Sequence, residues 1–264
     1  MIVAIIQARM NSSRLPGKIM LTVCEKPLLL HQIERMKDSN TIDKIVIATS
    51  VKKEDDIIKK FCDKNGIMCV RGSENDLLSR YKMAADATQA DIIVRLTSDT
   101  PLLEHDVIDS VVNTYIQNKY DFVSNSYPLP RTFPDGMNVE VFSKEILDEM
   151  HFNAKKPSER EHVTFYVLMQ PKKFKIFRVD TMKDVSDYRF NLDYKLDYEF
   201  IKEVFNNLYK NEQIFLLEDI IKFLEKNPKI LKINSEIEPY KGILNSFEED
   251  TKMGFKKSEN FFMK

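Results

Sequence analysis

Short apolar runs alternate with amphipathic segments through the first hundred residues, and this rhythm limits the possible folds more than any other feature. The apolar, β-rich runs are residues 2–7, 44–48, 67–70 and 92–96. Between them, apolar residues recur at helical spacing over residues 28–36, 55–62 and 77–87. Strands and helices alternating in this way are typical of βαβ units, so we predict an α/β fold with a mostly parallel central sheet flanked by helices.

The second half of the chain is less regular. Strands are predicted at residues 122–124, 139–142 and 175–179, and helices at 106–117, 144–151, 196–208 and 216–224. With 264 residues, the expectation is one large α/β domain with a small appendage. We place that domain at residues 1–240. Periodicity fades from about Tyr240, so residues 241–264 are expected to form a loose or partner-dependent tail.

Composition excludes several classes of protein. Forty Lys and Arg residues against 41 Asp and Glu give a net charge of −1, whereas a nucleic-acid-coating protein usually carries a basic excess. No apolar run approaches the ~18 residues of a membrane helix. The three cysteines show no Cys-x-x-Cys spacing, which indicates reduced thiols and a cytoplasmic location. We therefore expect neither a nucleic-acid nor a membrane partner.

A loop rich in cations follows the first strand, at the sheet edge where α/β proteins bind ligands. This first loop, residues 7–18, contains Arg9, Ser12, Ser13, Arg14, Pro16, Gly17 and Lys18. A polyphosphate needs backbone N–H donors and cations, and the loop offers both. It lacks the Gly-x-x-x-x-Gly-Lys-Ser/Thr pattern of a Walker A motif. A solvated basic surface loop is an equally good interpretation of these residues alone.

Two aspartates are candidate metal ligands. Asp99 follows the strand at 92–96, where a carboxylate suits a Mg²⁺ ion that also binds substrate phosphates. It could instead cap the turn before Pro101. Asp193 precedes the long amphipathic helix, and its residue type and position favour an N-cap over a second metal ligand.

A turn and a charged run complete the candidates. Pro134-Asp135-Gly136 is a turn signal, and it precedes the apolar run that contains Glu140. The run from Glu159 to His162 is most simply a solvated helix face, and a histidine such as His162 is more often structural than catalytic. The chain has only six glycines. Gly17 lies in the first loop, Gly136 in the Pro-Asp-Gly turn, and Gly72 in the loop after the apolar run at 67–70.

Taken in order, these motifs resemble those of a known family. The motifs are Gln7-Ala8-Arg9-Met10-x-Ser12-Ser13-Arg14-Leu15-Pro16-Gly17-Lys18, Arg95-Leu96-Thr97-Ser98-Asp99-Thr100-Pro101-Leu102, Pro134-Asp135-Gly136 with Val139-Glu140-Val141, and Arg160-Glu161-His162-Val163-Thr164. Over about residues 1–235 the chain is similar to the sugar-acid cytidylyltransferases. The most similar branch is the spore-coat polysaccharide type, related to CMP-Kdo and CMP-sialic acid synthetases.

The resemblance implies a Rossmann-like nucleotidyltransferase fold, a homodimer, and an insertion at about 125–185 for dimerisation and sugar binding. It implies that CTP activates a 2-keto-3-deoxy sugar acid to its CMP-sugar, with Mg²⁺ as cofactor and pyrophosphate as product. Catalysis would rest on Arg9, Lys18 and Asp99, and metal binding on Asp99 and Asp193. The nucleotide would contact Gln7, Ala8, Arg9, Ser12, Ser13, Arg14, Lys18, Arg71, Gly72 and Arg95. The sugar acid would contact Asp135, Glu140, Arg160, Glu161 and His162.

The chain departs from the family pattern at two places. Relatives usually carry Asp-Thr-Pro-Glu-Asp where this chain has Asp193-Tyr194-Lys195-Leu196-Asp197, and Asn138 replaces an acid. Three alternatives remain open. One is a nucleotidyltransferase that acts on a phosphorylated sugar or polyol and gives an NDP product. Another is a glycosyltransferase, although Asp99 is not part of an Asp-x-Asp pair. The third is a non-catalytic nucleotide-binding protein.

Overall fold

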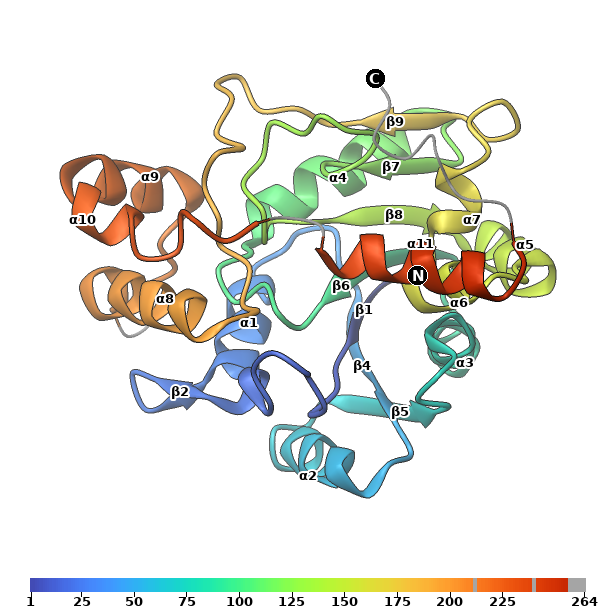
Figure 1. Ribbon diagram of the computed structural model, residues 1–264, viewed down its shortest axis with the longest axis horizontal. Coiled ribbons are helices and arrows are strands. Elements are labelled where there is room, and N and C mark those ends of the chain that lie inside the picture. The colour runs from blue at the N-terminus through green and yellow to red at the C-terminus, as the bar shows by residue number, and fades with distance from the viewer. Residues whose placement is uncertain (211–212, 239–240, 256–264) are drawn as a thin grey trace.

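A seven-stranded mixed sheet forms the centre of the molecule, in a computed structural model that describes residues 1–210, 213–238 and 241–255. The strand order is β5-β4-β1-β6-β8-β7-β9, and Figure 1 shows the sheet between two layers of helices. The strands are β1 (Ile2–Gln7), β4 (Lys44–Ser50), β5 (Met68–Gly72), β6 (Ile92–Thr97), β7 (Phe122–Ser124), β8 (Glu140–Ser143) and β9 (Ile176–Arg178). The predicted α/β class is confirmed.

Helices cover both faces of this sheet, and in the described residues none is long and apolar enough to cross a membrane. The longer helices are α1 (Leu28–Met36), α2 (Asp56–Lys64), α3 (Leu77–Thr88), α4 (His105–Gln117), α5 (Lys144–Asn153), α8 (Lys195–Leu208), α9 (Leu217–Lys226) and α11 (Lys241–Lys252). The shorter ones are α6 (Pro157–His162), α7 (Phe165–Leu168), α10 (Pro228–Leu231) and the 3₁₀ turns η1 (Lys18–Met20) and η2 (Lys53–Asp55).

The central strands are apolar along their whole length because both faces are buried. In β1, Ala4 and Ile6 pack in one core with α1, α4 and α8, and Val3 and Ile5 pack in a second core with α3 and α5. This alternation follows from the two-residue period of a strand. It explains why these strands have continuous hydrophobic sequences instead of alternating polar ones.

The strand directions bring the candidate loops to one edge. β1 and β6 are parallel, and the register pairs Gln7 with Thr97, so the first loop and the segment to Asp99 leave the sheet side by side. β8 is antiparallel to β6, which places Glu140, at its start, opposite Arg95. Three motifs that are far apart in sequence therefore meet at this edge.

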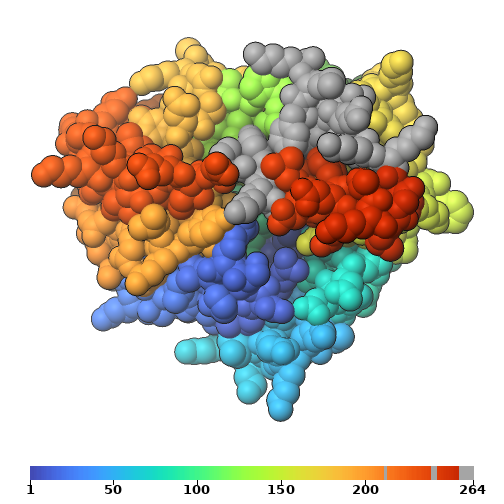
Figure 2. All heavy atoms as spheres, in the orientation of Figure 1, coloured from blue at the N-terminus to red at the C-terminus, as the bar shows by residue number. Residues whose placement is uncertain are grey.

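Several elements were not predicted from the sequence. A two-residue hairpin joins β2 (Thr22–Val23) to β3 (Lys26–Pro27). The helix α11 lies where a loose tail was expected, and its Asp250 accepts hydrogen bonds from the backbone and the hydroxyl of Ser158 on α6. Figure 2 shows this red helix directly above the blue N-terminal segment. Residues 256–264 of the expected tail lie outside the described residues.

Candidate active site

The first loop folds back on itself. The carbonyl of Met10 accepts hydrogen bonds from the backbone of Ser12 (3.1 Å) and of Gly17 (2.9 Å), and Gly17 adopts a φ of +69°. Met10 also donates its N–H to the carboxylate of Asp55, at 2.7 Å. The loop closes through a left-handed backbone conformation, and glycine adopts this conformation without strain. The closed loop directs Lys18 inward, so the solvated interpretation does not hold for that residue.

Lys18 connects the two candidate metal ligands. Its ammonium donates to Asp99 Oδ2 and Asp193 Oδ1, each at 2.9 Å, and to the carbonyl of Leu192 at 2.6 Å. Burial would lower the pKa of Lys18, but the two carboxylates outweigh burial and raise it above the usual value. Burial would raise the pKa of Asp99, and the nearby ammonium holds it below its usual value. Lys18 and Asp99 are therefore both charged at neutral pH.

Asp193 does not cap the helix that follows it. The carboxylate of Asp197, within the first turn of α8, accepts hydrogen bonds from the backbone N–H groups of Asp193 and Tyr194, both at 2.9 Å. The side chain of Asp193 instead faces Lys18 and Arg14, whose guanidinium is 2.8 Å from Asp193 Oδ1. The N-cap interpretation is wrong because Tyr194 occupies the N-cap position, and the Asp193 carboxylate pairs with the cations of Lys18 and Arg14.

The Pro134-Asp135-Gly136 turn packs directly against the segment before Asp193. Gly136 has a φ of +98°, and a Cβ placed there would lie 2.4 Å from the backbone nitrogen of Asn191. Asp135 exchanges two backbone hydrogen bonds with this segment, to Tyr188 (3.0 Å) and from Phe190 (2.6 Å). Only glycine permits this approach, which brings the Asp135 side chain to the same edge as Asp193.

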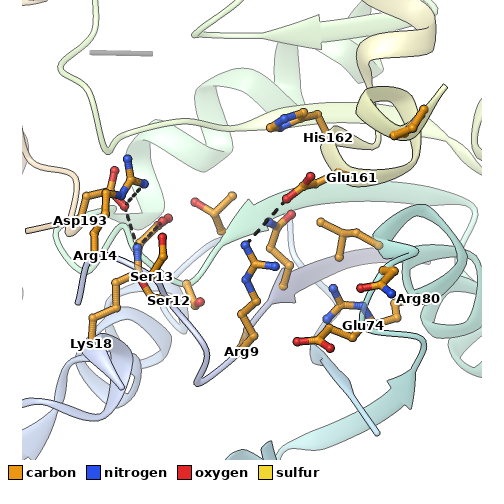
Figure 3. Close-up of a pocket in the computed structure, with 18 of the residues that line it drawn as sticks. Arg9, Ser12, Ser13, Arg14, Lys18, Glu74, Arg80, Glu161, His162 and Asp193 are labelled. Carbon is orange, nitrogen blue, oxygen red and sulfur yellow. Dashed lines mark hydrogen bonds and ion pairs between the residues drawn. The ribbon is translucent and has the colours of Figure 1, made fainter. Parts of the chain in front are cut away.

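A cavity of about 400 Å³ lies between the first loop, the start of α3 and α6. Figure 3 shows Arg14, Lys18 and Asp193 at one end, Glu74 and Arg80 at the other, and Arg9 between them. Its lining includes the predicted residues Gln7, Ala8, Arg9, Ser12, Ser13, Arg14, Lys18, Asp99, Glu161, His162 and Asp193. Arg9 lies 3.8 Å from the carboxylate of Glu161, across the opening.

A second cavity of about 220 Å³ adjoins the first. The two share the residues Gln7, Arg14, Thr97, Asp99, His162 and Asp193. Its other polar residues include Arg95, Arg131, Asp135, Asn138, Glu140, Arg189 and Asn191. The arginines are paired with carboxylates: Arg95 with Glu140 at 2.9 Å, Arg131 with Asp135 at 3.0 Å, and Arg189 with Asp197 at 2.8 Å. The second cavity is thus polar and close to neutral.

His162 lies where the two cavities meet. Its Nε2 shares a hydrogen bond with the hydroxyl of Ser246 on α11, at 2.8 Å, and its ring stacks on Phe165 at 4.5 Å between centroids. Burial, with the nearby charges of Arg95 and Arg9, lowers the pKa of His162 to about 3. The imidazole is neutral at pH 7 and can serve as a donor or an acceptor.

Three predicted residues lie outside the lining of both cavities. Arg71 donates to Asp56 (2.7 Å) and to two backbone carbonyls, and so holds the turn before α2. Arg160 binds the carboxylate of Asp76, which caps α3, and ties α6 to that helix. Gly72 lies beneath the side chain of Arg80. Arg95 was expected at the nucleotide, and the structure places it in the second cavity.

Sequence reasoning missed residues from two elements. Leu77 and Arg80 were predicted only as part of the helix at 77–87, and Glu74 and Asn75 were not singled out, yet all four line the first cavity. The helix α11 adds Glu249 to the first cavity and Ile243 to the second. No local signal identifies the residues of α11, because their role depends on packing against α6.

The two aspartates fit a magnesium ion. Mg²⁺ prefers hard oxygen ligands and keeps several waters, and here one oxygen of each carboxylate approaches the same cation, the Lys18 ammonium. Within the described ranges, no three His, Cys, Asp or Glu side chains are grouped to hold a metal. An ion bound here would therefore need phosphate oxygens and water to complete its coordination.

Comparison with known proteins identifies the family. The profile of the cytidylyltransferase family matches residues 3–231. The chain belongs to this family. It is 31% identical over 236 residues to the spore coat polysaccharide biosynthesis protein SpsF of Bacillus subtilis, covering 86% of this chain and 95% of that one. This nucleotidyltransferase chain is thus an enzyme of the cytidylyltransferase type.

Solved structures share the fold. A cytidylyltransferase from Leptospira borgpetersenii superposes with a TM-score of 0.83 at 37% identity, covering 88% of this chain and 96% of that one. A CMP:2-keto-3-deoxy-manno-octonic acid synthetase in complex with CTP superposes with a TM-score of 0.61 at 15% identity, covering 79% and 99%. At this low identity, the similarity to the synthetase shows a shared fold and nothing more.

Proposed function

We propose that the enzyme transfers CMP from CTP to a 2-keto-3-deoxy sugar acid of the nonulosonic or Kdo type and releases pyrophosphate. The product would be a CMP-sugar for surface glycan synthesis in the cytoplasm, made by a homodimer. The observation that carries this proposal is the pair of adjoining cavities, which share Asp99 and Asp193. One cavity has the cations of a polyphosphate site, and the other has the neutral polar lining that suits a polyhydroxylated sugar.

The cations of the first cavity would hold the triphosphate. Arg9, Arg14 and Lys18 can each make charge-assisted contacts with phosphate oxygens, and Ser12 and Ser13 add hydroxyl donors. When bound on Asp99 and Asp193, Mg²⁺ would neutralise charge on the α-phosphate and on the leaving pyrophosphate. Catalysis of such transfers is mostly positioning and charge stabilisation.

The reaction forms one bond and breaks one. The anomeric hydroxyl oxygen attacks the α-phosphorus in line, the bond from the α-phosphorus to the oxygen that bridges to the β-phosphate breaks, and the hydroxyl proton passes to the released pyrophosphate or to water. His162 faces both cavities and is neutral at pH 7, so it can hold the attacking hydroxyl by accepting its hydrogen bond. Asp99, with its lowered pKa, is a poor proton acceptor and better suited to a cation.

The second cavity favours a sugar acid over a sugar phosphate. Arg95, Arg131 and Arg189 are already paired with carboxylates, so little net positive charge remains for a phosphate dianion. Hydroxyl groups can exchange hydrogen bonds with Asn138 and Asn191, which line the same space. An NDP-forming reaction with a phosphorylated substrate is the second candidate.

The test is pyrophosphate release with each of the four NTPs against a panel of sugar acids and sugar phosphates. The proposal expects release with CTP and a 2-keto-3-deoxy sugar acid, and a CMP-sugar by mass spectrometry. Turnover confined to sugar phosphates, with an NDP product, would support the second candidate instead.

A further inference from the structure

Arg80 of α3 carries a buried guanidinium that the protein leaves without a partner. The residue is 3% exposed and lines the first cavity. Its Nε is buried and has no hydrogen-bond partner among residues 1–210, 213–238 and 241–255. By contrast, buried Arg35 donates to the carbonyls of Leu102, Leu103 and Phe215.

Such a group is unfavourable unless something else satisfies it. A buried, unpaired charge opposes folding, and buried polar atoms in native proteins nearly always have partners. Burial lowers the pKa of Arg80, and the nearby Arg9 lowers it further. The chain therefore keeps a guanidinium that weakens the free protein, in a place where a ligand can supply the missing acceptors.

The position of Arg80 indicates which part of a nucleotide it meets. Figure 3 shows Arg80 and Glu74 at the end of the cavity opposite Lys18 and Asp193. A triphosphate held at the Lys18 end directs its base toward the Arg80 end. Leu77 lines the cavity there and gives an apolar surface for a ring, while the carboxylate of Glu74 is an acceptor.

We propose that Arg80 recognises the base of the nucleotide by donating to O2 and N3 of cytosine, with Glu74 accepting from the N4 amino group. This assignment rests on the proposed function only in that the cavity takes a nucleoside triphosphate. Uracil presents an N3–H donor, which would face the Arg80 donors. A site built around such hydrogen bonds rejects an analogue that cannot make them, because buried groups are then left unpaired.

Gly72 makes room for this side chain. A Cβ at Gly72 would lie 2.9 Å from Arg80 Cγ and 3.0 Å from Met83 Sδ, so any larger residue must displace the stem of Arg80. Gly72 thus acts as a positioning residue for the guanidinium. Replacing it moves the guanidinium without removing its charge.

Binding measurements by calorimetry separate base recognition from phosphate binding. The ligands are CTP, UTP and inorganic tripolyphosphate, each with Mg²⁺, and the proteins are wild type, Arg80→Met and Arg80→Lys. Lys82→Met is the matched control, since Lys82 lies on the same helix and pairs outside the cavity with Asp86 and Asp148. In Arg80→Met we expect CTP affinity to fall at least about tenfold, UTP affinity to change little, and tripolyphosphate affinity to stay constant.

Other outcomes overturn the proposal. An equal loss for CTP, UTP and tripolyphosphate would make Arg80 a phosphate ligand, and unchanged CTP binding in Arg80→Met would remove it from the site. Arg80→Lys keeps the charge but loses the planar fork, so the preference for CTP over UTP should still fall. Gly72→Ala should reduce the same preference while retaining tripolyphosphate binding.

Thermal unfolding of the free protein gives an independent readout. Because Arg80 has no protein partner in the described structure, Arg80→Met should leave Tm unchanged or raise it, whereas a structural arginine would lower it. The nucleotide-binding measurements do not require the sugar acid, so they test Arg80 independently of the proposed reaction. If wild type prefers CTP but releases no pyrophosphate with any sugar acid, the proposed function fails and the assignment of Arg80 stands.

Discussion

At the residue scale, the ammonium of Lys18 joins three segments that are far apart in the chain. Asp99 follows β6, Asp193 precedes α8, and Lys18 ends the first loop. Two carboxylates this close would repel each other without a cation between them. Lys18 therefore stabilises the two carboxylates, and the same charge is available to a phosphate when a nucleotide binds.

Replacing Lys18 with methionine tests both roles. Lys18→Met should lower turnover by roughly 30- to 1,000-fold, since a charge-assisted contact in a dry site is worth ~2–4 kcal/mol in the transition state. It should also lower Tm, because Asp99 and Asp193 lose their counter-charge. Added Mg²⁺ should restore much of that Tm. The exposed Lys59→Met is the control, and undiminished turnover in Lys18→Met would contradict the proposed role.

Asp193→Asn separates metal binding from local structure. Because Asp197 provides the helix cap, α8 should stay intact, and the free energy of unfolding should fall only by about 1–3 kcal/mol through the lost charge pairs with Lys18 and Arg14. If Asp193 binds the metal, Asp193→Asn should weaken Mg²⁺ binding. The Mg²⁺ concentration for half-maximal activity should then rise at least about tenfold. Asp180→Asn is the control, since this exposed carboxylate pairs with Arg178 and accepts a hydrogen bond from Thr132 outside both cavities. An unchanged Mg²⁺ requirement would leave Asp99 as the sole protein ligand.

Residue identity predicted part of the site. Acids and cations placed just after strands indicated where Asp99 and Lys18 would lie, because parallel strands end at a common edge. Arg71 and Arg160 have the same chemistry, yet protein carboxylates bind them elsewhere. Whether a charged side chain faces a ligand or a neighbour depends on tertiary partners, and the one-dimensional pattern does not contain them.

At the scale of elements, α11 closes a site built by the rest of the chain. Its Ser246 contacts His162, its Phe247 packs 5.5 Å from the ring of Phe165, and its Asp250 binds Ser158. The family profile ends at residue 231, before this helix begins. Residues 158–165 are therefore held by an element that the family profile does not include.

Truncation after Glu238 should affect the second substrate more than the nucleotide. We expect the KM for the sugar acid to rise at least about tenfold, because His162 loses its partner and Ile243 no longer lines the second cavity. The affinity for CTP should change less than threefold, since the first loop and α3 remain. Asp250→Asn, which weakens the attachment of α11, should shift KM in the same direction. Equal losses for both substrates would indicate general unfolding of α6.

The start of α4 predicts a pH dependence of stability. Glu104 is buried and accepts a hydrogen bond from the backbone of Leu217 at 3.0 Å, so it joins α4 to α9. Burial raises its pKa from 4.5 to about 7. A raised folded-state pKa means that the contribution to stability is complete below the unfolded value and is lost as pH rises through about 7.

Urea unfolding between pH 5 and pH 8 measures this contribution. The difference in stability between wild type and Glu104→Gln should fall with rising pH by an amount on the order of 1–3 kcal/mol, because glutamine stays neutral, whereas His162, with its lowered pKa, contributes equally to both proteins. Glutamine can still accept from Leu217, so the variant should remain folded at both limits. If the free energy of unfolding of Glu104→Gln changes with pH as steeply as that of wild type, the pH dependence belongs to another group.

Elements with strong periodicity were predictable, and those defined by contacts were not. The strands of the parallel half and the helices α1 to α5 follow apolar patterns that burial enforces. The β2–β3 hairpin instead turns through Cys24 and Glu25, both with positive φ, without the glycine or asparagine that usually marks such a turn. Helix α6 lacks an apolar period and depends on the Arg160–Asp76 pair.

At the scale of the whole molecule, the sheet divides into two halves, and each half carries most of one cavity. The parallel strands β5, β4, β1 and β6 carry the loops of the first cavity. Beyond β6 the sheet continues with β8, β7 and β9, and the antiparallel β8 and the loops around it line much of the second cavity. The reversal of direction at β8 is what places Glu140 beside Arg95, and the reacting groups would meet at that boundary.

The expected homodimer needs an exposed apolar surface. The apolar run at 139–142 does not provide it, because Val139, Val141 and Phe142 are fully buried in the core. The edge strand β9 instead exposes Phe177 (38%), which stacks on Tyr120 at 4.6 Å, and Met182 nearby is fully exposed. An apolar edge of a sheet is normally covered, and a second copy of the chain would cover it.

Light scattering at micromolar concentration should give the mass of a dimer, and Phe177→Glu should give that of a monomer with a similar Tm. The control is Phe152→Glu on α5, since Phe152 is 77% exposed but lies on a helix away from the β9 edge. A charge at β9 would have to be desolvated in the dimer, whereas one at Phe152 would stay in water. A wild-type monomer would reject the assembly. A dimer that persists in Phe177→Glu but dissociates in Phe152→Glu would move the interface to α5.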